Sequence, residues 1–149
     1  KRQLDILIDN TRTPFTDIAK RLLISAGTVH VRVKKMEEAG LIKGSSLTLD
    51  YNKMGYSFIA YVGIYLEKTH QTKYVLERLK EIPYVTVAHI TTGKFNIYCK
   101  VRAKTTEHAK EIIFKIDDID GILRTETMIS LEESINDKKR LMHTIFNDL

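Results

Sequence analysis

The sequence predicts an α+β protein made of a helix-turn-helix domain followed by a β-α-β-β-α-β domain and a final helix. Two short amphipathic helices lie close together in the first 40 residues, and the second of them is basic. After residue 57 the pattern changes to apolar runs typical of strands, which alternate with helical spacing. A chain of 149 residues with 43% hydrophobic residues is long enough to bury one core or two small ones.

The segment 25–40 predicts the basic helix. Val29, Val33 and Met36 recur at i, i+4 and i+7, which places one apolar stripe along one side of a helix. Ser25 can cap its start, because the hydroxyl accepts an unpaired backbone N–H of the first turn. Gly40 can end it in the left-handed conformation. The other side carries Lys and Arg, so this helix has one side for a core and one for a negatively charged partner.

A short preceding helix makes this more than an ordinary surface helix with solvated lysines. Residues 16–22 form a second amphipathic pattern, for which Thr16 is a candidate cap. Only Leu23 and Ile24 separate the two helices, and such a pair is typical of a helix-turn-helix whose second helix enters the DNA major groove. Residues 1–10 predict a third helix that packs against both.

The chain then changes character. Residues 41–49 predict one strand or two short strands around Gly44, and a turn-rich connector follows. We therefore expect a DNA-binding domain over residues 1–44, a linking strand and hinge over 45–56, and a second domain over 57–149.

The second domain shows the split βαβ, ferredoxin-like order, with both helices on one face of an antiparallel sheet. Its predicted elements are strand 58–66, helix 72–82, strand 84–92, strand 95–101 with Phe95, Ile97, Cys99 and Val101 on one face, helix 105–116 capped by Thr105, strand 122–131 and helix 135–146. Apolar and tyrosyl residues also occupy the second face of the sheet. A homodimer packed sheet to sheet is therefore expected.

Charge and composition narrow the function. Residues 1–44 hold nine Lys/Arg and five Asp/Glu, a balance of +4, whereas residues 45–149 hold fifteen and fourteen, a balance of +1. A basic first module and a nearly neutral second one suggest a nucleic-acid binder tied to another activity. The single cysteine excludes an internal disulfide, and no histidine pair has metal-ligand spacing. We expect no cofactor, no metal and no membrane segment, and a cytoplasmic protein.

At this point the sequence resembles the Lrp/AsnC (feast/famine) family of transcriptional regulators over nearly its whole length. The resemblance rests on one run and on the Leu49-Asp50, Met54-Gly55 and βαββαβ pattern after it. The run is Ile18-Ala19, then Ser25-x-x-Thr28-Val29-x-x-Arg32-Val33-Lys34-Lys35-Met36-Glu37-x-x-Gly40-Leu41-Ile42-x-Gly44. The resemblance implies a winged helix-turn-helix, a linking strand, an effector-sensing domain, and homodimers that often assemble into octamers. It also implies an amino acid or related metabolite as effector, bound between dimers.

Contacts to double-stranded DNA are expected from the exposed side of the second helix. The candidate residues are Ser25, Gly27, Thr28, His30, Val31, Arg32, Lys34 and Lys35. Thr28 and His30 lie in the first turns, where base contacts usually fall. Arg32 either binds phosphate or fixes helix packing through an acidic partner. Val31 either touches a thymine methyl group or is a tolerated surface valine.

The resemblance places the effector near the loop between the second and third strands of the sensing domain, here Thr92, Gly93, Lys94, Phe95 and Asn96. The family often has Gly-Asp-Tyr/Phe-Asp there, so two acidic positions have become Lys94 and Asn96. Lys94 would suit an acidic ligand, and the alternative is a solvated loop lysine. A second departure is Leu23, where the family commonly has glycine, and a leucine there can contribute to the core.

These observations favour a sequence-specific DNA-binding regulator controlled by a small molecule, and not an enzyme. The first alternative is an enzyme on the same scaffold, since the tetrapyrrole decarboxylases of the sirohaem-to-haem route resemble this family at both domains. The second is an assembly or sensing module whose helical domain no longer binds DNA. The basic helix argues against both, and no convincing catalytic cluster supports the first.

Overall fold

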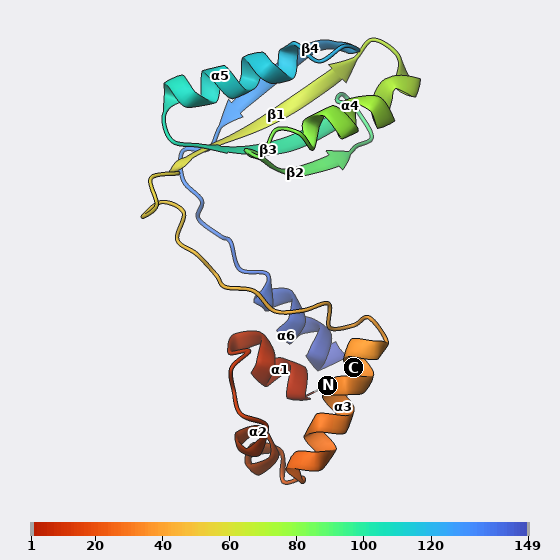
Figure 1. Ribbon diagram of the computed structural model, residues 1–149, viewed down its shortest axis with the longest axis vertical. Coiled ribbons are helices and arrows are strands. Elements are labelled where there is room, and N and C mark those ends of the chain that lie inside the picture. Colours follow the sequence, from red (N-terminus) through yellow and green to blue (C-terminus); the bar gives the residue numbers. More distant parts are fainter. Residues whose placement is uncertain (1, 149) are drawn as a thin grey trace. The chain divides into compact units, whose positions relative to one another are not determined.

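The computed structural model describes residues 2–148, which fold as two units (Figure 1). Each unit has its own hydrophobic core. Residues 2–48 and 134–148 form the first unit, and residues 49–133 form the second. The expectation of one continuous domain over 57–149 therefore differs from the structure. Residues 132–137, which connect the sheet to the last helix, have no helix or strand and are mostly polar.

The first unit consists of four helices: α1 (Arg2–Asp9), α2 (Phe15–Leu22), α3 (Ala26–Glu38) and α6 (Lys139–Asp148). Its core is small and lies between α2 and α3, where Ile18, Ala19, Val29 and Val33 are buried. The last helix packs beside the first, and the imidazole of His143 contacts the carboxylate of Asp5 there. This helix begins at Lys139, four residues later than residue 135, the start that the sequence predicted.

The ends of these helices test the predicted caps. The Ser25 hydroxyl accepts the backbone N–H of Thr28 at 3.1 Å, as expected, and Gly40 has a left-handed φ of 74° after the end of α3. Thr16 does not cap α2, because the helix begins one residue earlier and Pro14 occupies the N-cap position without a side-chain bond. Proline there fixes a φ compatible with the helix start.

The predicted strand over residues 41–49 does not form. In the described chain these residues have no strand partner, and a strand needs one to satisfy its backbone hydrogen bonds. The linking strand over 45–56 is replaced by an irregular segment and a turn over residues 51–55.

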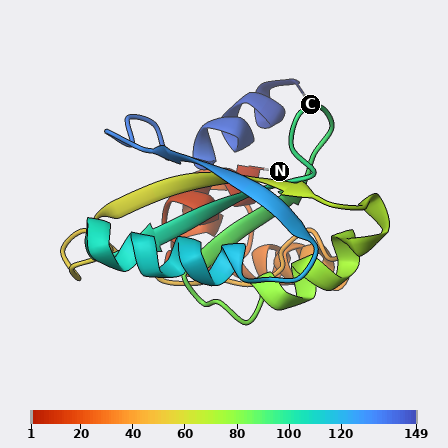
Figure 2. The same ribbon diagram turned by 90° about the horizontal axis from the view of Figure 1, so that it is seen from above.

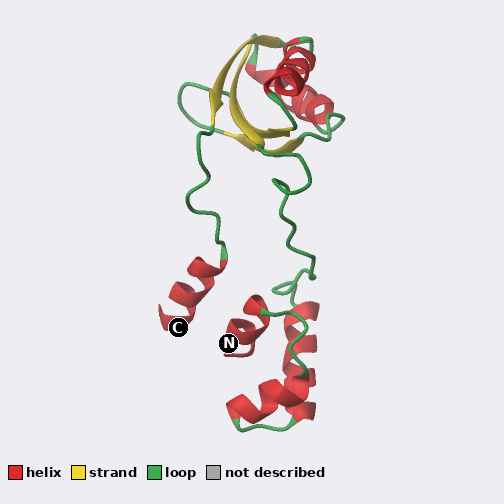
Figure 3. Ribbon diagram, turned by 90° about the vertical axis from the view of Figure 1, so that its left-hand side faces the viewer, coloured by secondary structure: helices red, strands yellow, loops and turns green. Residues whose placement is uncertain are grey.

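The second unit is a four-stranded antiparallel sheet with two helices on one face (Figures 2 and 3). Its strands lie in the order β2-β3-β1-β4, and its chain order is β1 (Phe58–Leu66), α4 (Thr72–Leu79), β2 (Val85–Ile90), β3 (Ile97–Ala103), α5 (Thr106–Asp117) and β4 (Ile122–Ile129), with a 3-10 turn η1 (Thr69–Gln71) before α4. The ferredoxin-like prediction is confirmed. Thr105 caps α5 as expected, accepting the His108 N–H at 3.1 Å.

Strand alternation divides the sheet into a core face under α4 and α5 and an open face on the other side. The core face buries Val62, Ile64, Ile97, Cys99 and Val101. The open face carries Tyr61, Gly63, Tyr65, Tyr98, Glu126 and Met128, and in the described chain no helix of this unit covers it. Phe95 was expected on the face of Ile97. It precedes β3 and instead contacts open-face rings.

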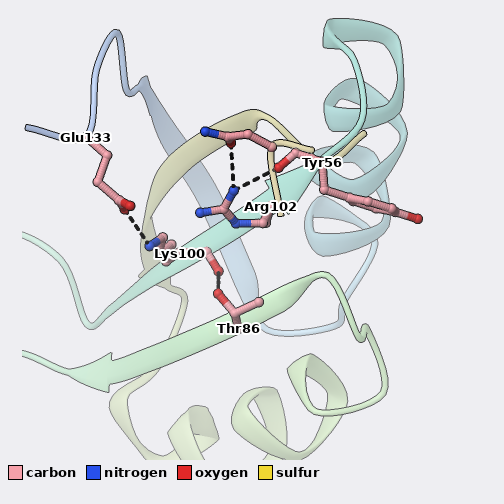
Figure 4. A network of polar contacts seen from close by, with 6 residues as sticks. Tyr56, Thr86, Lys100, Arg102 and Glu133 are labelled. Carbon is pink, nitrogen blue, oxygen red and sulfur yellow. Dashed lines mark hydrogen bonds and ion pairs between the residues drawn. The ribbon is translucent and has the colours of Figure 1, made fainter. Parts of the chain in front are cut away.

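Polar contacts tie the segment before β1 and the segment after β4 to the sheet (Figure 4). The Arg102 guanidinium donates to the carbonyl of Tyr56 at 2.8 Å and to the Asn52 side chain at 3.3 Å. Lys100 forms an ion pair with Glu133 at 3.2 Å. These two β3 side chains therefore fix where the chain enters and leaves the sheet.

Candidate functional sites

The first candidate site is the exposed side of α3. Val29 and Val33 turn inward and are 0% and 6% exposed, which fixes the rotation of the helix about its axis. This rotation leaves the other predicted DNA-binding positions outside. Ser25, Gly27, His30, Val31, Arg32, Lys34 and Lys35 are exposed, and Thr28 is half-buried. The structure thus brings all eight predicted residues onto α3 or its cap.

The cations of this surface are not engaged by acidic side chains of the described chain. Arg32, Lys34 and Lys35 form no ion pair with any other residue between 2 and 148. Lys20 and Arg21 in α2 are likewise exposed. An acidic packing partner for Arg32, one of the two alternatives above, is therefore absent from the described chain. The surface can offer its charge to a polyanion at no cost in broken salt bridges.

The first turn of α3 is fixed by local contacts. The Ser25 and Thr28 hydroxyls lie 2.8 Å apart, so Thr28 is engaged with the cap. The His30 ring lies 6.0 Å from the ring of Phe15 in α2. These contacts hold the helix start while leaving Val31, 50% exposed, on the surface.

The turn between α2 and α3 corrects one expectation. Leu23 does not join the core: it is 92% exposed and adopts a left-handed φ of 56°. An L-residue pays for that conformation and glycine does not. The helix-turn-helix therefore forms with a strained leucine at a position where glycine fits the backbone better.

The second candidate site is the loop between β2 and β3. Its base is closed by Thr91, whose N–H donates to the Asn96 carbonyl at 3.1 Å and whose hydroxyl donates to the Phe95 carbonyl at 2.9 Å. Asn96 also joins the loop to β1, because its N–H donates to the Ile64 carbonyl at 2.9 Å and its Oδ1 accepts the Leu66 N–H at 2.9 Å. Asn96 thus organises the loop through an uncharged acceptor.

Lys94 points toward β4 and forms an ion pair with Glu126 at 3.4 Å. The Glu126 carboxylate also accepts the Tyr65 hydroxyl at 3.1 Å, and Arg124 lies 3.9 Å from it. Tyr65 and then Glu126 raise the pKa of Lys94 above its ordinary value, because both favour the ammonium form. Lys94 is therefore neither unpaired nor simply solvated, and Thr92 and Gly93 remain exposed beside it.

Sequence reasoning missed Gly63, Tyr65, Arg124 and Glu126 around this loop. Their proximity depends on the pairing of β1 with β4, in which Gly63 faces Glu126 and Tyr65 faces Arg124. One local signal existed. A glycine inside an apolar strand run often marks a place where another group approaches closely.

Two grooves of the second unit lie away from this loop. A groove of about 360 Å³ lies between α4 and α5 and is lined in part by Arg78, Glu81 and Lys115. A smaller apolar one lies between α5 and β4. Residues 2–148 contain no group of three side chains suited to a metal ion, and none of the helices among them could span a membrane.

Two family profiles match this chain. The profile of the Lrp/AsnC ligand binding domain matches residues 59–139, more than half of the 149-residue chain, and that of the winged helix-turn-helix DNA-binding domain matches residues 4–43. The chain belongs to the Lrp/AsnC family. As a member, it is a transcriptional regulator in which α1 to α3 lie in the helix-turn-helix domain and the sheet lies in the ligand-binding domain.

Named relatives agree with this family assignment. The regulatory protein AsnC of Haemophilus influenzae is 37% identical over 133 residues, 89% of each chain. The transcriptional regulator LrpA of Pyrococcus abyssi is 39% identical over 132 residues, 87% of this chain and 92% of LrpA. Among solved structures, that of E. coli AsnC is similar with a TM-score of 0.89 and 34% identity, covering 91% of this chain and 92% of its own.

A more distant structure shares the fold. The feast or famine regulatory protein Rv3291c of M. tuberculosis, solved in complex with L-methionine, has a TM-score of 0.83 at 22% identity, and the similarity covers 91% of this chain and 92% of that one.

Proposed function

We propose that this protein binds double-stranded DNA sequence-specifically as a homodimer, with α3 as the recognition helix, and that an amino acid or related metabolite controls it from the 92–96 loop. The observation that carries the DNA-binding part is the exposed surface of α3. Its three cations have no partner in the described chain, while Val29 and Val33 anchor the opposite side. A dimer presents two such helices, so the operator should be roughly palindromic.

The test of the DNA-binding part is the double variant Lys34→Ala, Lys35→Ala. Duplexes selected by the wild-type protein from a random-sequence library serve as the probe. Removing two phosphate-binding charges from each protomer, and so four from the DNA-bound dimer, should weaken binding and reduce the slope of log K against log salt by about four. The matched control is Lys73→Ala, Lys115→Ala, which removes the same charge from the sensing unit. Unchanged binding and slope in the α3 variant would refute the assignment.

The homodimer is proposed through the open face of the sheet. Tyr61, Tyr65 and Tyr98 are only half-buried there, and Met128 is 45% exposed. Burying such an apolar face in an interface is more favourable than leaving it exposed to water. Octamers would be a further assembly of such dimers. Sedimentation of the wild-type protein and of Tyr61→Lys, which places a charge at the centre of the face, tests this interface: the charged variant should be monomeric.

The effector is proposed to lie against the 92–96 loop. Support comes from the ligand-binding family profile and from the M. tuberculosis protein of the same fold that holds L-methionine. A loop exposed on one chain suits a site completed by a second dimer. The test measures the melting temperature and the light-scattering mass with each of the twenty amino acids. A ligand that binds only the folded protein must raise the melting temperature.

We infer that the protein is not an enzyme, because the similar curated proteins are named as regulators. The tetrapyrrole decarboxylase alternative has a direct test, since a bound porphyrin would give a Soret band on titration. A protein that binds chromosomal DNA must be in the same compartment as the chromosome. In bacteria and archaea like those of its relatives, that compartment is the cytoplasm.

A further inference from the structure

The open face of the sheet has a notch at its centre. Gly63 lies in the central strand β1, directly between Tyr98 on β3 and Glu126 on β4. All three positions face the same way, because paired residues of adjacent antiparallel strands share a face. Two large side chains therefore flank a residue with none.

The ring of Phe95 fills this notch. A Cβ atom on Gly63 would lie 2.3 to 2.5 Å from three carbons of that ring, closer than real contacts allow. The ring also packs against Tyr65, with centroids 5.1 Å apart, and against Tyr98, with centroids 5.9 Å apart. Phe95 comes from the 92–96 loop, so this loop contributes an aromatic ring to the open face.

Two polar anchors flank the ring. On one side Asn96 is bound to the backbone of β1 by its main chain and by its side chain, at 2.9 Å each. On the other side Lys94 is paired with Glu126, which the Tyr65 hydroxyl also contacts. Three consecutive loop residues therefore each hold a different part of the sheet. The loop cannot change shape without moving the ring or breaking one of these contacts.

We propose that Gly63 is the positioning residue for the 92–96 loop, and that the seat of Phe95 on Gly63 couples the conformation of this loop to self-association through the open face. The second half rests on the proposed function, because it takes the open face as the dimer interface and the loop as the effector site. In that setting a small molecule bound at the loop shifts assembly by favouring one position of the Phe95 ring.

The alternative view of Gly63 makes the opposite prediction. A glycine inside a strand weakens it, so Gly63→Ala should stabilise the sheet if nothing occupies the notch. If Phe95 occupies it, the new methyl group expels the ring. The direction of the effect of this single variant therefore separates the two views.

The experiment is a double-mutant cycle of Gly63→Ala, Phe95→Ala and their combination in the full-length chain. Hydrogen exchange of the Leu66 and Asn96 amides reports the loop anchors, and sedimentation reports self-association. In Gly63→Ala both amides should exchange roughly tenfold faster and self-association should change. In the Phe95→Ala background, adding Gly63→Ala should cost nothing further, because the methyl group then enters a vacant notch.

Two outcomes would overturn the first half of the proposal, and a third would overturn the second half. Unchanged exchange in Gly63→Ala, or equal effects of Gly63→Ala with and without Phe95, would show that the notch does not position the loop. A loosened loop with unaltered self-association would remove the coupling. Failure of the proposed function would give a different result. The wild-type protein would be monomeric, or would respond to no amino acid, while the hydrogen-exchange effects of the double-mutant cycle would still be seen. If Gly63→Ala does not fold, recovery of folding in the Gly63→Ala, Phe95→Ala double variant would still demonstrate the contact between the two residues.

Discussion

The two units of this protein differ most in how much apolar surface each buries. The second unit, called the sensing unit below, has a core of thirteen buried residues from three strands and two helices. Among the described residues the helix-turn-helix unit has four, all from α2 and α3. Hydrophobic burial is the main favourable term in folding, so the helix-turn-helix unit gains far less stabilisation from its core. We therefore expect the helix-turn-helix unit to be the less stable of the two.

The helix-turn-helix unit depends on other interactions to compensate for its small core. A cap at Ser25, Gly40 after α3 and the packing of α6 on α1 each contribute where core burial is limited. Leu23 works against them, since its backbone is left-handed and its side chain lies in water. The two units should therefore respond separately to mutation, and four measurements test this difference.

The largest expected effect is the protection of Cys99, which lies in β3 and reports on the sensing unit alone. Burial raises the pKa of this thiol to about 12 from an ordinary value of 9.0, because the thiolate is disfavoured away from water. The attacking species is the thiolate, so labelling at pH 8 should be about 1000-fold slower in the native protein than in the unfolded chain. Timed alkylation with iodoacetamide measures both rates. Similar rates would mean that the sheet opens readily.

The next effect comes from the core of the small unit. Ile18 is 0% exposed, and Ile18→Ala should lower the free energy of unfolding of that unit by about 2–5 kcal/mol. The measurement is DNA binding together with Cys99 labelling in the same preparation. Binding should be lost while Cys99 stays protected. The matched control, Ile64→Ala in the sensing unit, should instead increase Cys99 labelling. A common response to both variants would show one cooperative body.

A smaller effect, of opposite sign, is expected at the turn. Leu23→Gly should stabilise the first unit by about 0.5–1 kcal/mol, because glycine adopts the left-handed conformation without the penalty a side chain brings. Urea unfolding followed at the helical signal measures this. Leu23→Ala keeps the backbone penalty and should give little or no gain, so equal gains from both variants would trace the effect to the exposed side chain instead.

The smallest effect is expected between α6 and α1. His143 contacts the carboxylate of Asp5 and lies 3.8 Å from that of Asp9, and all three side chains are more than a third exposed. His143→Gln should therefore destabilise the docking of α6 by only about 0.2–1 kcal/mol. Hydrogen exchange of the α6 amides detects this. His89→Gln on β2 provides the control, and a loss of the whole unit's stability would show that α6 is part of its essential core.

Much of this architecture was predictable because it follows from local signals. The bounds of β1 agree with the predicted 58–66, and the helices α2 to α5 lie within a few residues of their predicted positions. Side-chain periodicity and capping residues encode such elements within one or two turns of chain. The exposed side of α3 was predictable for the same reason, since the apolar stripe fixes the opposite surface.

Other features depended on partners distant in sequence. Residues 41–49 have a strand pattern but no partner strand, α6 packs on α1 rather than staying with the sheet, and Phe95 turns away from the face of Ile97 to fill the notch at Gly63. The pairing of Lys94 with Glu126 likewise needs the register of β1 and β4. Side-chain patterns along the chain encode the elements, their order and the basic helix, because these are local properties. The packing partner of each element emerges only in the folded protein, since it results from a competition among contacts across the whole chain.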